Sequence, residues 1–331
     1  MTLLGRLVLT VAIGLGGTLL VAGGLILSDR QQPDLRAADG QGLRFEVMAA
    51  AAPDVPLRHW TARDGARLGY RQWSSGRDGA PLVVAVHGSG WHGGQFRGLG
   101  ARLAAEGLAD VVAPDLRGHG PAPQRRGDLD HIGQFEEDLA DLIAAVARPG
   151  QRVVLLGHSS GGGLVVRMAG GPYGALIQGA VLLAPFLQHD APTARPGSGG
   201  WARVMVRRII GLTMLNALRI RALNHLPVIQ FRFPSSVLDG PSGAEATRAY
   251  SYRLNTSYAP RRDWRRDVAG LPPFLLVAGQ DDEAFVAAAY EPAMAPANPN
   301  GRYRLVPAGH LDVVDSPDTF DAIRTWLGEV R

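Results

Sequence analysis

Two residue types are absent from this chain of 331 residues, and each absence narrows its chemistry. Without cysteine, the chain has no disulfide, no thiolate metal site, no cysteine nucleophile and no lipid-modified N-terminal cysteine. Lysine is also absent, so all 34 basic residues are arginine, which we attribute to the composition of the source genome. Hydrophobic residues make up 46% of the chain, enough for a large core in one or two domains.

Charged residues are missing from Leu7 to Leu27. A helix of about 20 residues spans the roughly 30 Å hydrocarbon layer, so this run predicts a single transmembrane anchor over residues 1–28. A cleaved signal peptide is the alternative, because Arg6 precedes the run and small residues follow it at Ala37 and Ala38. Arginines on both sides of the run do not orient it. The short tail before it favours a cytoplasmic N-terminus and a catalytic domain in the periplasm.

The rest of the chain divides into a linker, residues 29–54, and a folded domain, residues 55–331. In this domain short apolar runs alternate with amphipathic stretches, which indicates βαβ units and a mostly parallel sheet with helices on both faces. The expected strands are residues 55–61, 67–73, 81–87, 110–113, 152–156, 177–183, 273–278 and 303–306. The expected helices are residues 95–106, 132–146, 161–169 and 317–330.

The alternation is interrupted over residues 188–267, which predicts a helical cap inserted into the sheet order. This segment holds 13 arginines against five acidic residues. Apolar residues between Trp201 and Leu218 recur at three- and four-residue spacing, which predicts a basic amphipathic helix. The apolar face of this helix could pack on the main domain, line a substrate-binding site or contact a membrane. Because the positive excess is confined to the cap and no recognition motif is present, we expect no nucleic-acid binding.

A candidate nucleophile follows the strand expected at residues 152–156. Gly157-His158-Ser159-Ser160-Gly161 matches the pattern G-x-S-x-G, in which a serine lies on a strained turn between a strand and a helix. The pattern alone is weak in a chain with 43 glycines, but here it has the required strand before it and helix after it. We therefore predict Ser159 as the nucleophile.

A serine hydroxyl needs a general base, and the base needs a carboxylate that orients it. In folds of this kind the chain order is Ser, acid, His, and His310 is the histidine that follows the cap. His310 also lies on a loop after a strand, from which it can reach Ser159. His87, His119 and His158 are expected to be packed or turn-bonding histidines instead.

Three carboxylates crowd the loop after the strand at residues 273–278. A Gly-x-x-Asp turn from Gly279 would point Asp282 inward, so we predict Asp282 as the acid of the triad. Asp281 is the next candidate and Glu283 the third.

Two backbone N–H groups must bind the oxyanion that forms on the substrate carbonyl. One is expected from Ser160, the residue after the nucleophile, where the helix dipole assists. The other is expected from Ser89, in the glycine-rich loop that follows the buried strand at residues 81–87.

Together these motifs resemble those of the monoacylglycerol lipase and lysophospholipase branch of the α/β hydrolases, the serine aminopeptidase-type hydrolases. The matching pieces are His87-Gly-Ser-Gly90, Asp115-Leu-Arg-Gly-His-Gly120, Gly157-His-Ser-Ser-Gly-Gly162, Gly279-Gln-Asp-Asp282 and Gly309-His310. The resemblance implies an α/β-hydrolase fold, a Ser-Asp-His triad and no metal or organic cofactor. It gives the turn at Asp115–Gly120 a structural role. The family commonly has methionine where this chain has Ser160, a change that a backbone donor tolerates.

The expected activity is hydrolysis of a carboxylic ester through an acyl-enzyme. A membrane anchor and an arginine-rich cap favour a lipid-like ester, such as a lysophospholipid or a monoacylglycerol. An aminopeptidase would need acidic residues in the cap, which has few. An acyltransferase with the same triad and a non-catalytic membrane-tethered binding protein remain alternatives, and the oligomeric state is left open.

Overall fold

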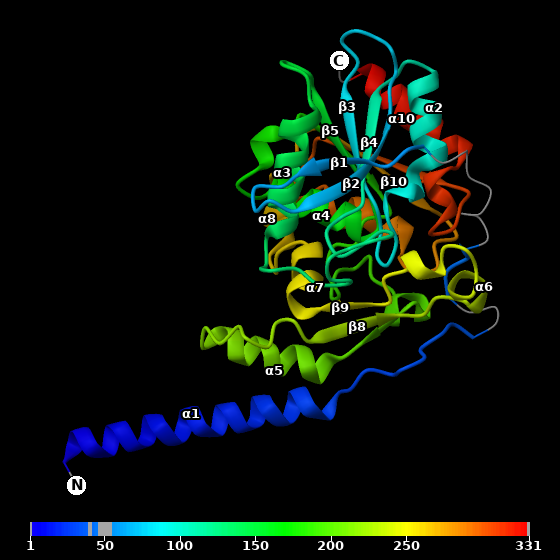
Figure 1. Cartoon of the computed structure of the whole chain (residues 1–331). Helices are drawn as coiled ribbons and strands as arrows, with labels where there is room; N and C mark the ends of the chain where they lie inside the picture. Colours follow the sequence, from blue (N-terminus) through cyan, green and yellow to red (C-terminus); the bar gives the residue numbers. More distant parts are fainter. Residues whose placement is uncertain (1, 39–41, 46–54, 330–331) are drawn as a thin grey trace.

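A single mixed sheet forms the centre of the molecule in the computed structural model, which describes residues 2–38, 42–45 and 55–329 (Figure 1). Its eight strands follow the order β1-β2-β4-β3-β5-β6-β10-β11. β1 and β2 form an antiparallel hairpin, and β2 joins β4 antiparallel, whereas the other neighbours are parallel. The strands are β1 (Arg58–Thr61), β2 (Arg67–Trp73), β3 (Leu82–Val86), β4 (Asp110–Pro114), β5 (Val153–His158), β6 (Gly179–Leu183), β10 (Phe274–Gly279) and β11 (Gly301–Val306).

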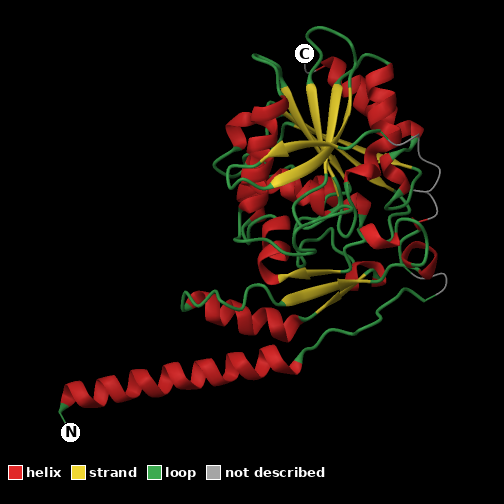
Figure 2. Ribbon diagram, in the orientation of Figure 1, coloured by secondary structure: helices red, strands yellow, loops and turns green. Residues whose placement is uncertain are grey.

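Helices cover both faces of this sheet (Figure 2). α2 (Arg97–Ala105) and α10 (Pro317–Glu329) pack on one face. α3 (Gln134–Val146), α4 (Ser160–Ala169) and α8 (Trp264–Ala269) lie on the other. Every residue of β3, β4, β5, β6 and β10 is buried, as continuous apolar runs of parallel strands predict.

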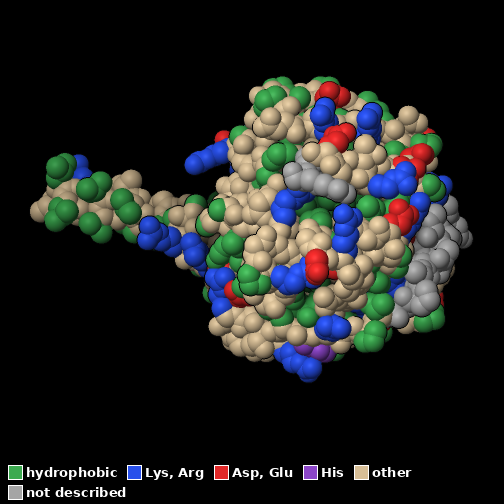
Figure 3. All heavy atoms as spheres, turned by 90° about the horizontal axis from the view of Figure 1, so that it is seen from above, with side chains coloured by type: hydrophobic (Ala, Val, Ile, Leu, Met, Phe, Trp, Pro, Cys, Tyr) green, Lys and Arg blue, Asp and Glu red, His purple; other side chains and the backbone are tan. Residues whose placement is uncertain are grey.

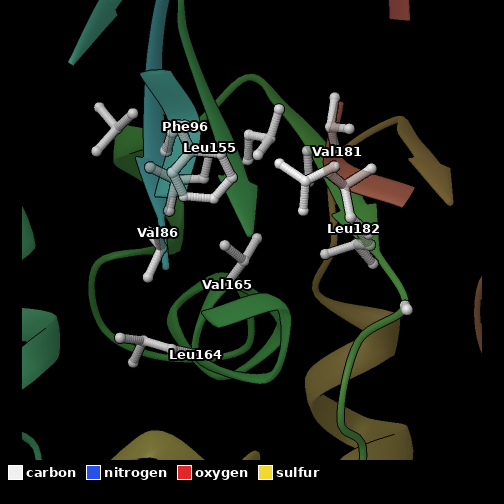
Figure 4. Close-up of a cluster of buried hydrophobic side chains, with 14 of the residues drawn as sticks. Val86, Phe96, Leu155, Leu164, Val165, Val181 and Leu182 are labelled. Carbon is white, nitrogen blue, oxygen red and sulfur yellow. The ribbon is translucent and has the colours of Figure 1, made fainter. Parts of the chain in front are cut away.

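The core around the central strands is drawn in Figure 4. Val86 of β3, Leu155 of β5 and Val181 of β6 belong to neighbouring strands and form one buried cluster with Leu164 and Val165 of α4. All five side chains are at most 1% exposed. This packing fixes α4, and with it the residue that precedes the helix, against the end of the sheet.

The cap lies between β6 and β10 and contains strands as well as helices. β7 (Ala202–Val204), β8 (Pro227–Phe231) and β9 (Ala249–Ser251) form a small antiparallel sheet. Its helices are α5 (Val206–Ala217), α6 (Ser235–Leu238) and α7 (Tyr252–Tyr258). The amphipathic helix predicted from Trp201 begins only at Val206, because residues 202–204 pair with β8 instead. The predicted strands and helices of the main domain occur within a few residues of their expected bounds.

The first helix, α1 (Leu3–Ser28), extends away from this body (Figures 1 and 3). By length and composition it can cross a membrane. Its C-terminal part packs against the cap, where Ala22 and Ile26 contact Leu212 and Leu215 of α5. Gly211 permits this approach, since a Cβ there would lie 2.7 Å from the carbonyl oxygen of Ala22.

The segment after α1, expected to be a linker without regular structure, follows the surface of the cap. The carboxylate of Asp29 accepts a hydrogen bond from the N–H of Arg207 at 3.2 Å. Gln32 exchanges two hydrogen bonds with the side chain of Gln230. Ala37 donates its N–H to the carbonyl of Phe233 at 3.1 Å. Residues 46–54 of the expected linker lie outside the described residues.

Candidate active site

Ser159 lies between β5 and α4 with φ 54° and ψ −121°, a conformation that non-glycine residues rarely adopt. Neighbouring glycines make this turn possible. A Cβ on Gly157 would lie 2.4 Å from the carbonyl oxygen of Gly161, and a Cβ on Gly161 would lie 2.2 Å from that of Val86. The two glycines of the motif G-x-S-x-G are therefore required sterically. The turn that they allow places the Ser159 hydroxyl at the end of the sheet.

The loops after β10 and β11 bring Asp282 and His310 to this hydroxyl. The Nε2 atom of His310 lies 3.0 Å from the Oγ atom of Ser159. On its other side the ring donates Nδ1–H to the Oδ2 atom of Asp282 at 2.9 Å. His310 and Asp282 are each 2% exposed, so the hydrogen bond between them is shielded from water, whereas the one to Ser159 is partly buried. The three predicted triad residues thus form one continuous hydrogen-bonded chain.

The three carboxylates after β10 have different contacts. Asp282 contacts the imidazole of His310, and its Oδ1 atom accepts the N–H groups of Ala284 and Phe285. Burial alone would raise the pKa of the Asp282 carboxyl, but the imidazole and these N–H groups outweigh burial and lower it. Asp281 is exposed, and Glu283 accepts the backbone N–H of His310. Asp282 therefore has the geometry that the triad requires.

The two residues predicted to bind the oxyanion flank Ser159. Ser160 is the first residue of α4, and Ser89 follows β3, with their hydroxyl oxygens 2.6 Å apart. Among the residues that the structure describes, neither backbone N–H has a hydrogen-bond acceptor. Both amides are therefore free to bind a carbonyl oxygen.

Cap residues that the sequence motifs did not indicate hold the loop that carries Ser89. The N–H of Gly90 donates to the phenolic oxygen of Tyr250 at 2.5 Å. The N–H of Thr247 donates to the carbonyl of Gly90 at 2.8 Å. Gly90 has φ +77°, and a Cβ there would lie 2.6 Å from the ring of Phe233. No local pattern in the sequence could reveal these contacts, because they join segments about 160 residues apart.

His158 connects the oxyanion loop to the loop of His310. The side chain of Gln95 accepts the N–H of Gly88 at 2.9 Å and donates to the Nδ1 atom of His158 at 2.8 Å. His158 in turn donates Nε2–H to the carbonyl of His310 at 2.8 Å. Burial, with a smaller effect from the nearby His310, lowers the pKa of His158 to about 3, so this ring is neutral. The ring of His158 therefore helps to position the loop of His310, and it makes no hydrogen bond to the Ser159 hydroxyl.

Comparisons with known proteins agree with this architecture. A family model described as serine aminopeptidase, S33, matches residues 79–298. A monoacylglycerol lipase of Mycolicibacterium smegmatis is 36% identical over 118 residues, which is 34% of this chain and 42% of that protein. The human monoglyceride lipase is 29% identical over 166 residues, which is 50% of this chain and 52% of that protein. The chain thus spans about half the length of these relatives.

The fold comparison covers more of the chain. A soluble variant of monoglyceride lipase from Saccharomyces cerevisiae superimposes with a TM-score of 0.62 at 17% identity, over 86% of this chain and 97% of that one. The predicted α/β-hydrolase fold is confirmed. Since the family model covers about two thirds of its length, this chain belongs to the S33 serine aminopeptidase family of α/β hydrolases.

Proposed function

We propose that the chain hydrolyses carboxylic esters through an acyl-enzyme formed on Ser159. The observation that carries this proposal is the linear arrangement of three groups, with 3.0 Å from Ser159 Oγ to His310 Nε2 and 2.9 Å from His310 Nδ1 to Asp282 Oδ2. This arrangement lets the imidazole take a proton from the hydroxyl while the carboxylate stabilises the resulting positive charge.

The proposed reaction has two halves. The Ser159 oxygen attacks the ester carbonyl, His310 takes the hydroxyl proton, and the amides of Ser89 and Ser160 bind the oxyanion. When the carbon–oxygen bond breaks, His310 gives its proton to the leaving alcohol. Water then enters, and its oxygen attacks the acyl carbon while His310 takes one of its protons. When the bond from the acyl carbon to the Ser159 oxygen breaks, His310 returns that proton to the Ser159 oxygen and the carboxylic acid leaves.

For the substrate we propose an ester with an apolar acyl group and a neutral leaving group, such as a monoacylglycerol. The lysophospholipid alternative depended on free arginines in the cap, but several have carboxylate partners. Arg203, Arg248 and Arg253 pair with Asp29, Asp34 and Asp128. Two carboxylates, Glu283 and Asp312, lie beside the His310 loop. They disfavour an anionic head group there. The names of the two lipase relatives support the same class.

The same two carboxylates support a second candidate function, that of an aminopeptidase. Glu283 and Asp312 both bind the guanidinium of Arg44, so they can bind a cation such as a substrate ammonium group. An aminoacyl amide therefore belongs in any substrate panel. An acyltransferase would use the same acyl-enzyme and would form a new ester when an added alcohol competes with water.

The test compares Ser159→Ala with Ser160→Ala in the full chain. Ser159→Ala should abolish labelling by a fluorophosphonate probe and hydrolysis of p-nitrophenyl esters. Ser160→Ala keeps its backbone N–H and should keep both. A panel of monodecanoylglycerol, lysophosphatidylcholine and alanine p-nitroanilide then identifies the substrate class. Labelling that persists in Ser159→Ala would contradict the assignment of the nucleophile.

For the cell we propose that α1 anchors the protein in a membrane, with the catalytic domain on the periplasmic side. The exposed apolar side chains along the free part of α1 support this, among them Leu3 at 89%, Leu4 at 69% and Ile13 at 66% exposure. In Figure 3 the helix projects from the body with hydrophobic side chains along it. A globular surface rarely leaves so many large apolar side chains in water.

A further inference from the structure

Two side chains of the segment that follows α1 fill the space over Ser159. Leu43 and Phe45 are only 8% and 6% exposed. The ring of Phe45 lies 6.0 Å from that of Trp91, 5.3 Å from Trp201 and 5.2 Å from Phe233, measured between ring centroids. We call these three partners the aromatic cup. Trp91 follows the oxyanion loop, whereas Trp201 and Phe233 belong to the cap.

With these side chains in place, almost no room is left at the candidate active site. The cavity bounded by Leu43, Phe45, Ser159 and His310 has a free volume of about 20 Å³. On this measure a cavity needs about 10–15 Å³ to hold one water molecule, so this cavity admits about one water and no substrate. A neighbouring cavity of about 340 Å³ shares Trp91 with it, but neither Ser159 nor His310 lines that cavity. An ester therefore cannot bring its carbonyl to Ser159 unless Leu43 and Phe45 move.

Arg44, which lies between Leu43 and Phe45, attaches the segment to two carboxylates beside the loop of His310. Arg44 donates to the Oε1 atom of Glu283 at 3.0 Å and to the Oδ2 atom of Asp312 at 3.3 Å. The other carboxylate oxygens of these residues accept the N–H groups of His310 and Gly309, both at 2.7 Å. The Arg44 side chain is 54% exposed, and ion pairs at such positions contribute little stability. The attachment is therefore reversible.

We propose that the aromatic cup is the acyl-binding site of the proposed esterase, and that Leu43–Phe45 occupies it in place of the acyl chain in the resting enzyme. The inference rests on the proposed function. A cup that buries a leucine and a phenylalanine side chain offers an acyl chain the same apolar contacts. The acyl chain and the segment Leu43–Phe45 then compete for the same surface, so the substrate binds only when the segment is released. The segment is therefore autoinhibitory.

The competitor stays attached to the enzyme. Ala37 is hydrogen-bonded to Phe233, and the six residues from Ala37 to Leu43 reach at most about 20 Å when extended. A released segment therefore remains close to the cup, and its competition does not depend on enzyme concentration. If the occupied form predominates ten to one, the apparent affinity for the ester falls roughly ten-fold.

The first test removes the occupant from the full chain in detergent micelles. In the double variant Leu43→Ser with Phe45→Ser, the rate constant for fluorophosphonate labelling and kcat/KM for p-nitrophenyl decanoate should both rise by roughly ten-fold. Leu35→Ser is the matched control, because Leu35 is equally buried at 8% exposure in the same segment but does not line the cavity. It should leave both rates unchanged. Unchanged rates in the double variant overturn the inference.

The second test follows the segment itself and needs no turnover. Because the chain has no cysteine, a single Leu43→Cys substitution gives one thiol for a maleimide probe. In the Ser159→Ala background this thiol should react slowly, and saturating monodecanoylglycerol should accelerate the reaction several-fold. An unchanged reaction rate with the ester present overturns the inference.

These results also separate the inference from the proposed function. If the unaltered chain hydrolyses esters and is labelled, but neither test shows the expected change, the function stands and the inference fails. If no form of the chain is labelled or active, the proposed function fails, and the inference fails with it.

Discussion

Gly90 donates its N–H to the phenolic oxygen of Tyr250 across 2.5 Å, which joins the loop of the candidate oxyanion hole to strand β9 of the cap. The Tyr250 hydroxyl in turn donates to the Nε2 atom of His119 at 2.7 Å. Since Ser89 directly precedes Gly90, the cap fixes the direction of a proposed oxyanion donor. The cap is thus part of the proposed catalytic geometry as well as a cover.

Tyr250→Phe should lower kcat for p-nitrophenyl esters by roughly five- to ten-fold, with a smaller change in KM. The substitution removes the acceptor of one buried hydrogen bond, which typically contributes about 1 kcal/mol. The loss should fall on the transition state, because oxyanion contacts strengthen as the tetrahedral intermediate forms. Steady-state kinetics of the purified full chain measures both constants.

Tyr303→Phe is the control for that substitution. Tyr303 lies on the edge strand β11, and its hydroxyl has no hydrogen-bond partner within the described part of the chain. Its kinetics should match those of the unaltered chain. Equal kcat values for Tyr250→Phe and Tyr303→Phe would contradict a role of the Tyr250 hydroxyl in positioning.

Asp282→Asn should lower kcat by roughly 10³- to 10⁴-fold and leave the fold intact. An amide cannot stabilise the imidazolium of His310, and it favours the wrong tautomer of the ring. Asp281→Asn, one residue earlier and exposed, should retain nearly full activity. The pair of variants distinguishes the two carboxylates by ester hydrolysis, and the reverse ranking would reassign the acid of the triad.

Stability should fall as the solution is acidified below about pH 6.5. Burial lowers the pKa of both His119 and His158 to about 3, so the folded chain does not take up these protons until the pH nears 3. The unfolded chain takes them up below about pH 6.5, which favours unfolding. For each ring, the free energy of unfolding should fall by about 1.4 kcal/mol for every unit by which the pH is lowered in this range.

Urea unfolding between pH 7 and pH 4.5 measures this slope. His119→Asn removes one of the buried rings that stay neutral in the folded chain, so its unfolding free energy should vary with pH by about one proton less than that of the unaltered chain. If the two slopes coincide, His119 is not held neutral in the folded chain.

Intact-mass measurement should show that α1 is retained. A membrane anchor predicts the full mass and a chain that stays in the membrane fraction after carbonate extraction. A cleaved signal peptide predicts loss of the first 37 or 38 residues and release into the soluble fraction. The packing of Ala22 and Ile26 on α5 would be absent from the processed form.

Several parts of this protein follow from local patterns of residues in the chain. Continuous apolar runs identified the buried strands β3, β5 and β10 because parallel strands covered on both faces need apolar side chains at every position. The elbow around Ser159 was evident because its tight turn allows only glycine at positions 157 and 161. His310 followed from chain order and from its place after a strand.

The contacts of side chains that share a loop, and the pairing of distant segments, depend on the three-dimensional fold. The turn from Gly279 favoured Asp282 over Asp281 and Glu283, but the contact of Asp282 with the imidazole depends on the direction of the loop after β10. The strand β7 replaced one turn of an expected helix because β8 supplied a pairing partner. The occupation of the aromatic cup by Leu43 and Phe45 likewise depends on contacts between distant segments, which no local pattern encodes.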